Sequence, residues 1–333
     1  RKALFGLCLG VFIGSIVLLL LQVNQARLQS VPAQGGEYVE GLLGAPRFIN
    51  PLLASSPVDR DLTTLIYSGL LRSTETGQFI PDLAESYTVS PDGLIYNFTL
   101  KPNLVWQDGE SVTINDVIFT ITKAKEPALK SPRRAGWEGV EVEKVDDRRV
   151  IFKLKQRYAP FLENLTLGLL PAHRWQKISS EVFPFTDLNR EPVGTGPYQI
   201  SAIKRDRDNL PLAYTLTPFR RFALGRSKIA KVIIRFYPNE ETLLSAYRAG
   251  EIGALSALDP ATARTLEQGG ARVLSTTLPR VFGVFFNQNQ QKLFTRSEGR
   301  AALDAAVNRE AIISEVFHGY AQSLTGPLPP SLF

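Results

Sequence analysis

The chain has 333 residues, of which 44% are hydrophobic and 21% charged, a balance typical of a folded protein with two or three domains. The formal net charge of +6 falls to +3 when residues 1–35 are left aside, which is too small a bias to argue for a nucleic-acid partner. The single cysteine, Cys8, excludes an internal disulfide and a cysteine-rich metal site.

The first residues predict a membrane segment. Two cations precede an uncharged apolar run, residues 3–21, which at about 1.5 Å per residue is long enough to cross the hydrocarbon layer of a bilayer. We interpret residues 1–23 as a single-pass anchor in the cytoplasmic membrane, with the bulk of the chain on the outer side because the cations favour the cytoplasm. The alternative is a signal segment cleaved near residues 31–33. Residues 24–36 are polar and predict a flexible linker.

From residue 37 onward, strand and helix patterns alternate, which predicts an α/β architecture. Strands are expected at 37–43, 94–101, 140–155 (two strands), 194–204, 212–219, 231–237, 252–258, 271–277 and 280–287. Helices are expected at 113–125, 160–170, 239–251, 260–268 and 298–320, with one more whose apolar face holds Leu62, Leu65, Ile66 and Leu70.

Two local patterns sharpen this prediction. In the strand 94–101, Tyr96, Phe98 and Leu100 alternate with more polar positions, as in a half-buried strand. The helix at 113–125 begins with Thr113 as the expected N-cap and has Asp116 three residues later.

The sequence contains no recognisable catalytic constellation. Neither a Gly-x-Ser-x-Gly nor a phosphate-binding Gly-x4-Gly-Lys motif occurs, and His173 and His318 are far apart in the sequence. The acids Asp146 and Asp147 lie in a predicted turn, and the Gly194–Gly196 segment precedes a strand where a phosphate site would need a helix. We therefore expect no enzyme activity, no catalytic residue, no metal ligand and no cofactor.

Several segments together resemble the bacterial extracellular solute-binding proteins of family 5, the oligopeptide, dipeptide and nickel receptors of ABC importers. The resemblance is carried by "IPDLAESYTVSPDGLIYNFTLKPNLVWQDGESVTINDVIFT", "VGTGPYQI" and "FGVFFNQN". It runs from about residue 37 to residue 330. The resemblance implies a scaffolding role for the Trp106–Gly109 turn.

The resemblance implies a periplasmic-binding-protein-like fold of two lobes with an extra subdomain in the first. Residues 37–57 and 186–278 would form the ligand-binding lobe, residues 58–185 the inserted subdomain, and residues 279–333 the start of a second lobe. Family members are longer, so we expect that second lobe to be incomplete in this chain.

The resemblance also implies a ligand site. The end of the first strand would offer main-chain groups to an extended peptide. The "GTGPY" bend and one asparagine would lie near the junction of the lobes. The candidate residues are Glu40, Gly41, Leu42, Leu43, Gly194, Thr195, Tyr198 and Asn287.

The function implied is a membrane-tethered receptor outside the cytoplasm that captures peptides for the permease and ATPase of an ABC importer. A receptor for nickel chelates or other small solutes is one alternative. A sensor, or a degenerate domain that binds solute without transport, is another.

Overall fold

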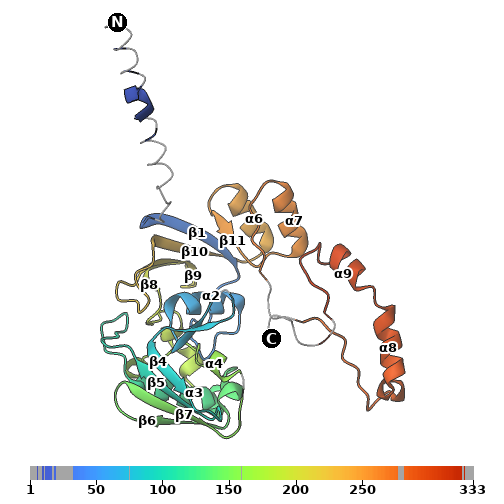
Figure 1. Ribbon diagram of the computed structural model, residues 1–333, viewed down its shortest axis with the longest axis horizontal. Helices are drawn as coiled ribbons and strands as arrows, with labels where there is room; N and C mark the ends of the chain where they lie inside the picture. The colour runs from blue at the N-terminus through green and yellow to red at the C-terminus, as the bar shows by residue number, and fades with distance from the viewer. Residues whose placement is uncertain are drawn as a thin grey trace.

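The computed structural model describes residues 6, 10, 12–16, 19, 33–74, 76–158, 160–276, 281–324 and 326. Residues 12–16 are helical and exposed, and they lie apart from the folded body (Figure 1). Among the described residues, no helix combines the length and the apolar character that crossing a bilayer requires. Most of the predicted anchor and linker lies outside the described residues.

A five-stranded mixed sheet forms the upper part of the body in Figure 1. Its order is β11-β1-β10-β9-β8; β1 runs parallel to β10 and β11, whereas β9 is antiparallel to β10 and β8. The strands are β1 (Gly35–Leu43), β8 (Tyr198–Arg205), β9 (Pro211–Pro218), β10 (Ile229–Tyr237) and β11 (Ala254–Leu255).

The two faces of this sheet are covered by different helices. Helix α6 (Glu240–Arg248) packs Leu243 against one face, where Val39 of β1 contributes to the same small cluster. Helix α2 (Pro57–Ile66) contributes Leu62 and Ile66 to the large core on the other face. Because side chains alternate between the two faces of a strand, Val39 of β1 faces helix α6, whereas Leu42 faces the core that includes helix α2.

The predicted helix that includes Leu70 ends earlier than expected. Helix α2 stops at Ile66, and Leu70 is buried beyond its end, directly before β2 (Leu71–Ser73). The apolar spacing of Leu70 reflects burial in the core and not membership of the helix, a distinction that periodicity alone does not make.

A second sheet of four antiparallel strands lies below the first, in the order β4-β5-β7-β6. Its strands are β4 (Ala84–Val89), β5 (Ile95–Leu100), β6 (Val140–Lys144) and β7 (Arg149–Leu154), and helix α3 (Ile114–Lys125) packs beside it. The predicted alternation is confirmed, because Tyr96, Phe98 and Leu100 are buried. The ring of Phe98 stacks on that of Tyr87 with centroids 5.0 Å apart.

Short elements occupy the connections between these strands and helices. They are β3 (Phe79–Pro81), which pairs with β2, the helices α4 (Phe161–Asn164) and α5 (Ala172–Trp175), and four 3₁₀ turns at Pro127–Leu129, Arg134–Trp137, Phe183–Phe185 and Asp187–Asn189. One continuous core runs through both sheets, since Phe98 of β5 and Tyr214 of β9 belong to the same buried cluster.

The C-terminal part is helical but loosely attached. It contains α7 (Pro260–Gln268), a 3₁₀ turn at Lys292–Thr295, α8 (Ser297–Ala306) and α9 (Arg309–Glu315), and Figure 1 shows α8 and α9 extending away from the sheets. The helical structure expected over residues 298–320 is thus confirmed, and it consists of two helices, α8 and α9.

Two predicted strands in this part are wrong over their described residues. Residues 271–276 and 281–287 have no regular structure. The side chain of Phe285 is 95% exposed, and no described strand pairs with either segment. An apolar β-prone run forms a strand only where a partner strand satisfies its main chain.

Candidate functional site

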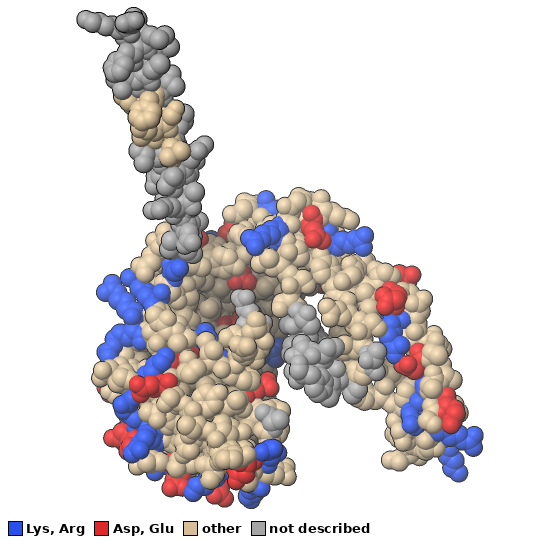
Figure 2. Space-filling view, in the orientation of Figure 1, with Lys and Arg blue, Asp and Glu red and all other residues tan. Residues whose placement is uncertain are grey.

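The carboxyl end of β1 brings together a small group of polar side chains. The hydroxyls of Ser256, just after β11, and of Tyr38, on the same face of β1, lie near the Glu40 carboxylate and lower its pKa. Asp61 of α2 lies near enough to this carboxylate to act on it electrostatically, where the sheet and the helix meet. Figure 2 shows a hollow on this side of the molecule, below α6 and α7, with acidic side chains inside it.

The surroundings of Glu40 and Asp61 raise the pKa of both carboxyl groups, which favours their protonated form or a nearby positive charge. Burial raises the pKa of Glu40, and the nearby Asp61 carboxylate raises it further, while the hydrogen bond from Ser256 opposes the shift. Burial likewise raises the pKa of Asp61, against the effect of Arg60. A cationic or hydrogen-bond-donating group of a ligand would therefore be stabilised here.

The loop after β11 has an unusual backbone at this position. Ala257, next to Ser256, has φ of 58°, in the left-handed region that non-glycine residues seldom occupy. The surrounding structure holds this conformation at a small energetic cost, and such positions are concentrated at binding sites.

Leu43 has main-chain groups that the sheet leaves unpaired. Gly253 N–H donates to Val39 O (3.0 Å), so Val39 directs its peptide groups toward β11. Since hydrogen-bonding direction alternates along a strand, Leu43 points its N–H and C=O to that same side. The pairing with β11 ends at Gly41, so these groups have no strand partner on that side among the described residues.

Gly41 and Leu42, two other predicted site residues of β1, have packing roles. A Cβ on Gly41 would lie 2.5 Å from side-chain atoms of both Ile252 and Leu243, so glycine lets the α6 layer approach the sheet closely. Leu42 is buried in the core on the opposite face. Leu43 is exposed.

The Gly194–Tyr198 bend forms a junction inside the body. Gln107, in the Trp106–Gly109 turn, accepts from Gly194 N (3.0 Å) through its side-chain oxygen and donates to Tyr198 O (2.8 Å) through its amide. A Cβ on Gly194 would come within 1.9 Å of Ile66 O, at the end of α2. This bend therefore joins α2, the turn and β8, and its exposure to a ligand is small.

Thr195 lies in the same junction. Its side chain is 2% exposed, and its hydroxyl has no hydrogen-bond partner among the described residues. The hydroxyl of Tyr198 donates to Ile229 O (3.3 Å) at the start of β10.

The predicted site residues fall into three separate places. Strand register puts Tyr198 level with the start of β1 and places Leu43 at its other end. Asn287 lies beyond both, in an exposed turn where its side-chain oxygen accepts from Asn289 N (3.1 Å). The structure thus brings Glu40–Leu43 together, and separately Gly194, Thr195 and Tyr198, without joining the two groups.

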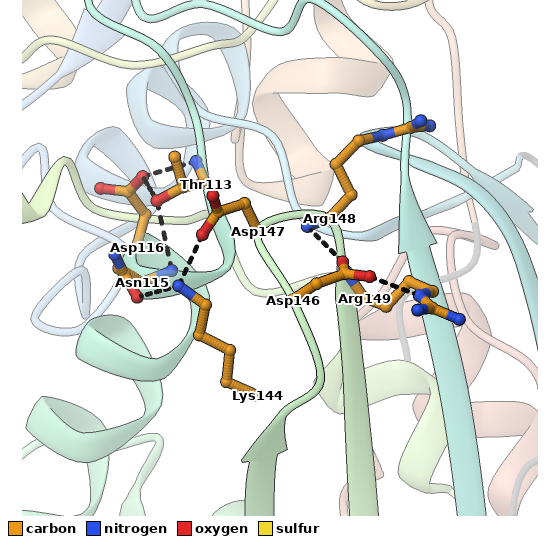
Figure 3. Close-up of polar contacts among 8 residues, drawn as sticks. All are labelled: Thr113, Asn115, Asp116, Lys144, Asp146, Asp147, Arg148 and Arg149. Carbon is orange, nitrogen blue, oxygen red and sulfur yellow. Dashed lines mark hydrogen bonds and ion pairs between the residues drawn. The ribbon is translucent and has the colours of Figure 1, made fainter.

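A second charged cluster surrounds the β6–β7 turn (Figure 3). Thr99, the turn residues Asp146 to Arg148 and Arg149 at the start of β7 line an open surface hollow of about 360 Å³. Its charges are already paired: Asp146 with Arg149 (2.6 Å), Asp147 with Lys144 (2.6 Å) and Arg148 with Glu85 (2.7 Å). This mutual pairing makes the cluster a poor candidate for a ligand site.

The remaining cavity offers no ligand site, and the acidic and histidine side chains of the described residues offer no metal site. A cavity of about 10 Å³ between α3 and the α4 region, lined by Leu70, Trp137 and Asn164 among others, has room for little more than one water molecule. Within the ranges that the structure describes, no three His, Cys, Asp or Glu side chains gather in a way that could hold a metal ion.

Sequence reasoning missed three members of the β1 group: Tyr38, Asp61 and Ser256. Tyr38 shares a face with Glu40 at spacing two, which is a usable signal. Asp61 and Ser256 reach Glu40 only because α2 and β11 flank β1, and that arrangement follows from tertiary packing.

Comparison with known proteins identifies the class. The profile of the bacterial extracellular solute-binding proteins, family 5 (middle region), matches residues 78–333. The chain therefore belongs to this family of solute-binding proteins, whose members have a mixed α/β fold.

Individual relatives differ in what they bind. The oligopeptide-binding protein AppA of Bacillus subtilis is 28% identical over 86% of this chain and 53% of its own length. Its structure in complex with a nonapeptide superposes with a TM-score of 0.74 and 26% identity, over 90% of this chain and 59% of AppA. The chain thus spans about half the length of the curated relatives it matches.

Two further solved structures carry other ligands. NikZ of Campylobacter jejuni, in complex with Ni(L-His), has a TM-score of 0.68 and 26% identity over 88% of this chain and 57% of NikZ. AgaA of A. tumefaciens R10, in complex with agropinic acid, has a TM-score of 0.72 and 26% identity over 89% of this chain and 59% of AgaA.

Proposed function

We propose that this chain is a peptide-capturing receptor that works outside the cytoplasmic membrane and delivers its ligand to the permease and ATPase of an ABC importer. The observation that carries the proposal is the similarity to AppA bound to a nonapeptide, which extends over 90% of this chain. A receptor of this kind needs shape and hydrogen-bonding groups and no catalytic machinery.

The organisation we propose follows the family. Residues 37–57 and 186–278 form the ligand-binding lobe, residues 58–185 an inserted bracing subdomain, and residues 279–333 the beginning of a second lobe. Residues 3–21 anchor the receptor in the cytoplasmic membrane, and such a tether keeps it concentrated near the importer.

We further propose that the ligand lies along the carboxyl end of β1. The unpaired N–H and C=O of Leu43 are oriented like those of a strand edge, which binds an extended peptide without regard to its sequence. Glu40 and Asp61 beside it would favour a positively charged ligand group. The ligand-contact roles of Gly194, Thr195, Tyr198 and Asn287 receive less support, because their described contacts are internal or local.

Uptake in the source organism tests the function directly. Deletion of the gene should abolish uptake of labelled peptides and leave uptake of nickel–histidine and of opines unchanged. Loss of nickel or opine uptake with normal peptide uptake would contradict the proposal and favour the corresponding small-solute receptor.

A pair of substitutions tests the binding mode. Leu43→Pro removes the main-chain N–H, whereas Leu43→Ala keeps it and serves as the control. By titration calorimetry with a nonapeptide, Leu43→Pro should weaken binding by about fivefold or more, the size of one lost hydrogen bond. Equal affinities for the two variants would mean that the Leu43 peptide group does not contact the ligand.

A further inference from the structure

The connection between β9 and β10 carries positive charge without acidic neighbours in the sequence. Residues 209–239 contain six Lys and Arg and no Asp or Glu. Two of these cations, Lys231 and Arg235, form ion pairs with Glu37 and Glu251. The other four form no ion pair with any residue in the described ranges: Arg220, Arg221, Arg226 and Lys228.

This connection, residues 219–230, is here called the basic loop, and it is held in a defined position. Lys101 Nζ donates to Ala223 O (3.2 Å), and Arg221 Nη2 donates to Asn103 O (3.1 Å). The guanidinium of Arg72 lies over the ring of Phe222, 5.3 Å from its centroid. These contacts hold the part of the basic loop around residues 221–223 against the body.

The basic loop lies where the chain enters the body. Gly35, the first residue of β1, donates its N–H to Lys228 O (2.9 Å). Figure 2 shows Lys and Arg side chains gathered on this flank, near the start of β1. Two large apolar side chains stand exposed among them, Leu224 (42%) and Ile229 (40%).

We propose that the basic loop rests on a bilayer surface that contains anionic lipid headgroups. Unpaired cations with exposed apolar side chains between them form the combination that binds such an interface. Each cation held near an anionic bilayer strengthens association by about fivefold. The proposal adds to the predicted anchor at residues 1–23, because contact through this flank would fix the orientation of the body on the membrane. It does not depend on which solute the protein binds.

The test uses the full chain with Cys8→Ser and one new cysteine that carries a fluorescent label. Ser227→Cys places the label in the basic loop, and Asp208→Cys places it in the β8–β9 hairpin, at the other end of the same sheet. Each protein is incorporated into vesicles of phosphatidylcholine alone or of phosphatidylcholine with phosphatidylglycerol. Quenching by aqueous iodide then reports the exposure of each label to water.

We expect phosphatidylglycerol to lower the quenching of the label at position 227 by about threefold, and to leave that at position 208 unchanged. High salt, or the double substitution Arg226→Glu with Lys228→Glu, should restore quenching at position 227. The matched double substitution Lys204→Glu with Arg207→Glu, in the hairpin, should have no effect. Thermal unfolding of each variant checks that the fold is retained.

Three outcomes would overturn the proposal. The first is equal quenching at position 227 in both kinds of vesicle. The second is equal protection at positions 227 and 208. The third is protection that survives the charge reversal, which would mean that the anchor alone brings this flank to the membrane.

Discussion

Gln107 connects three segments that are far apart in the sequence. Its side chain bonds Gly194 in one direction and Tyr198 in the other, and a longer contact of 3.3 Å reaches Ile66 O at the end of α2. Turn chemistry predicts the Trp106–Gly109 turn, with φ of 97° at Gly109, from sequence alone. The partner of the Gln107 side chain is not predictable, because a side-chain amide has no preferred sequence separation for its hydrogen bonds.

Gly194 tolerates no side chain, which gives the first prediction. Gly194→Ala would put a Cβ 1.9 Å from the main-chain oxygen of Ile66, and backbone cannot move aside easily. We expect the free energy of unfolding to fall by about 2 kcal/mol or more in urea denaturation. Gly253→Ala is the control, since its Cβ would meet only Val39 O, at 3.8 Å. Similar losses for the two variants would show that the junction is not tightly packed.

Glu40 makes stability depend on pH in a direction that can be worked out. Burial, with a smaller contribution from Asp61, raises its pKa in the folded state. The protonated form is therefore the favoured one, and its contribution is complete below the ordinary value of 4.5 and lost as pH rises through the folded-state pKa.

Glu40→Gln removes this dependence. The variant should match the unsubstituted chain below pH 4.5 and exceed its free energy of unfolding by about 0.5 kcal/mol at neutral pH, the size of a like-charge contact. Urea denaturation across this pH range measures the difference, with Glu138→Gln at an exposed position as the control. A difference that stays constant with pH would contradict the raised pKa of Glu40.

At the scale of elements, the start of α3 shows what local sequence can predict. Thr113 caps the helix and Asp116 completes the capping box, as the Thr-x-x-Asp spacing indicates. The second role of Asp116 is tertiary: its other oxygen accepts from Ala172 N (2.8 Å) at the start of α5. Only the fold brings residue 172 to this position.

Asp116→Ala should therefore lower the free energy of unfolding by more than the loss of an ordinary helix cap does. It would leave the partly buried N–H groups of Thr113 and Ala172 without these partners, for a loss of about 2 kcal/mol in the free energy of unfolding. Asp147→Ala is the control in the same region (Figure 3), because that side chain is 79% exposed and pairs only with Lys144. The control should lose about 0.5 kcal/mol or less. Equal losses would mean that the link to α5 contributes nothing.

Residues 280–287 show where the sequence pattern fails. Their composition is that of a buried strand, yet the described residues 281–287 have no regular structure and pair with no described strand. Strand propensity measures how well a segment fits a pleated, half-buried surface, and no such surface lies beside it among the described strands.

Hydrogen exchange measures this directly. Amides of residues 281–286 should exchange in this chain nearly as fast as in an unfolded peptide, whereas those of β10 should be protected by pairing on both sides. Protection of 281–286 comparable to that of β10 would mean that the segment is paired in solution.

At the scale of the whole molecule, the two sheets share one buried core. A single buried cluster includes residues of both, and the junction of α2, Gln107 and the Gly194–Tyr198 bend ties the sheets together. The α/β class and most elements follow from periodicity and turn residues in the sequence. The strands that flank β1 cannot be predicted in this way. Its parallel partners β10 and β11 follow it by about 200 residues, and local sequence patterns carry no information about such distant pairing.

The most direct test of the account measures amide hydrogen exchange in the full chain with and without a peptide of defined sequence. The account predicts that the peptide slows exchange at Leu43 and leaves the Gly194–Tyr198 bend unchanged. Unaltered exchange at Leu43 with saturating peptide, or slowing there by nickel–histidine but not by peptide, would contradict it.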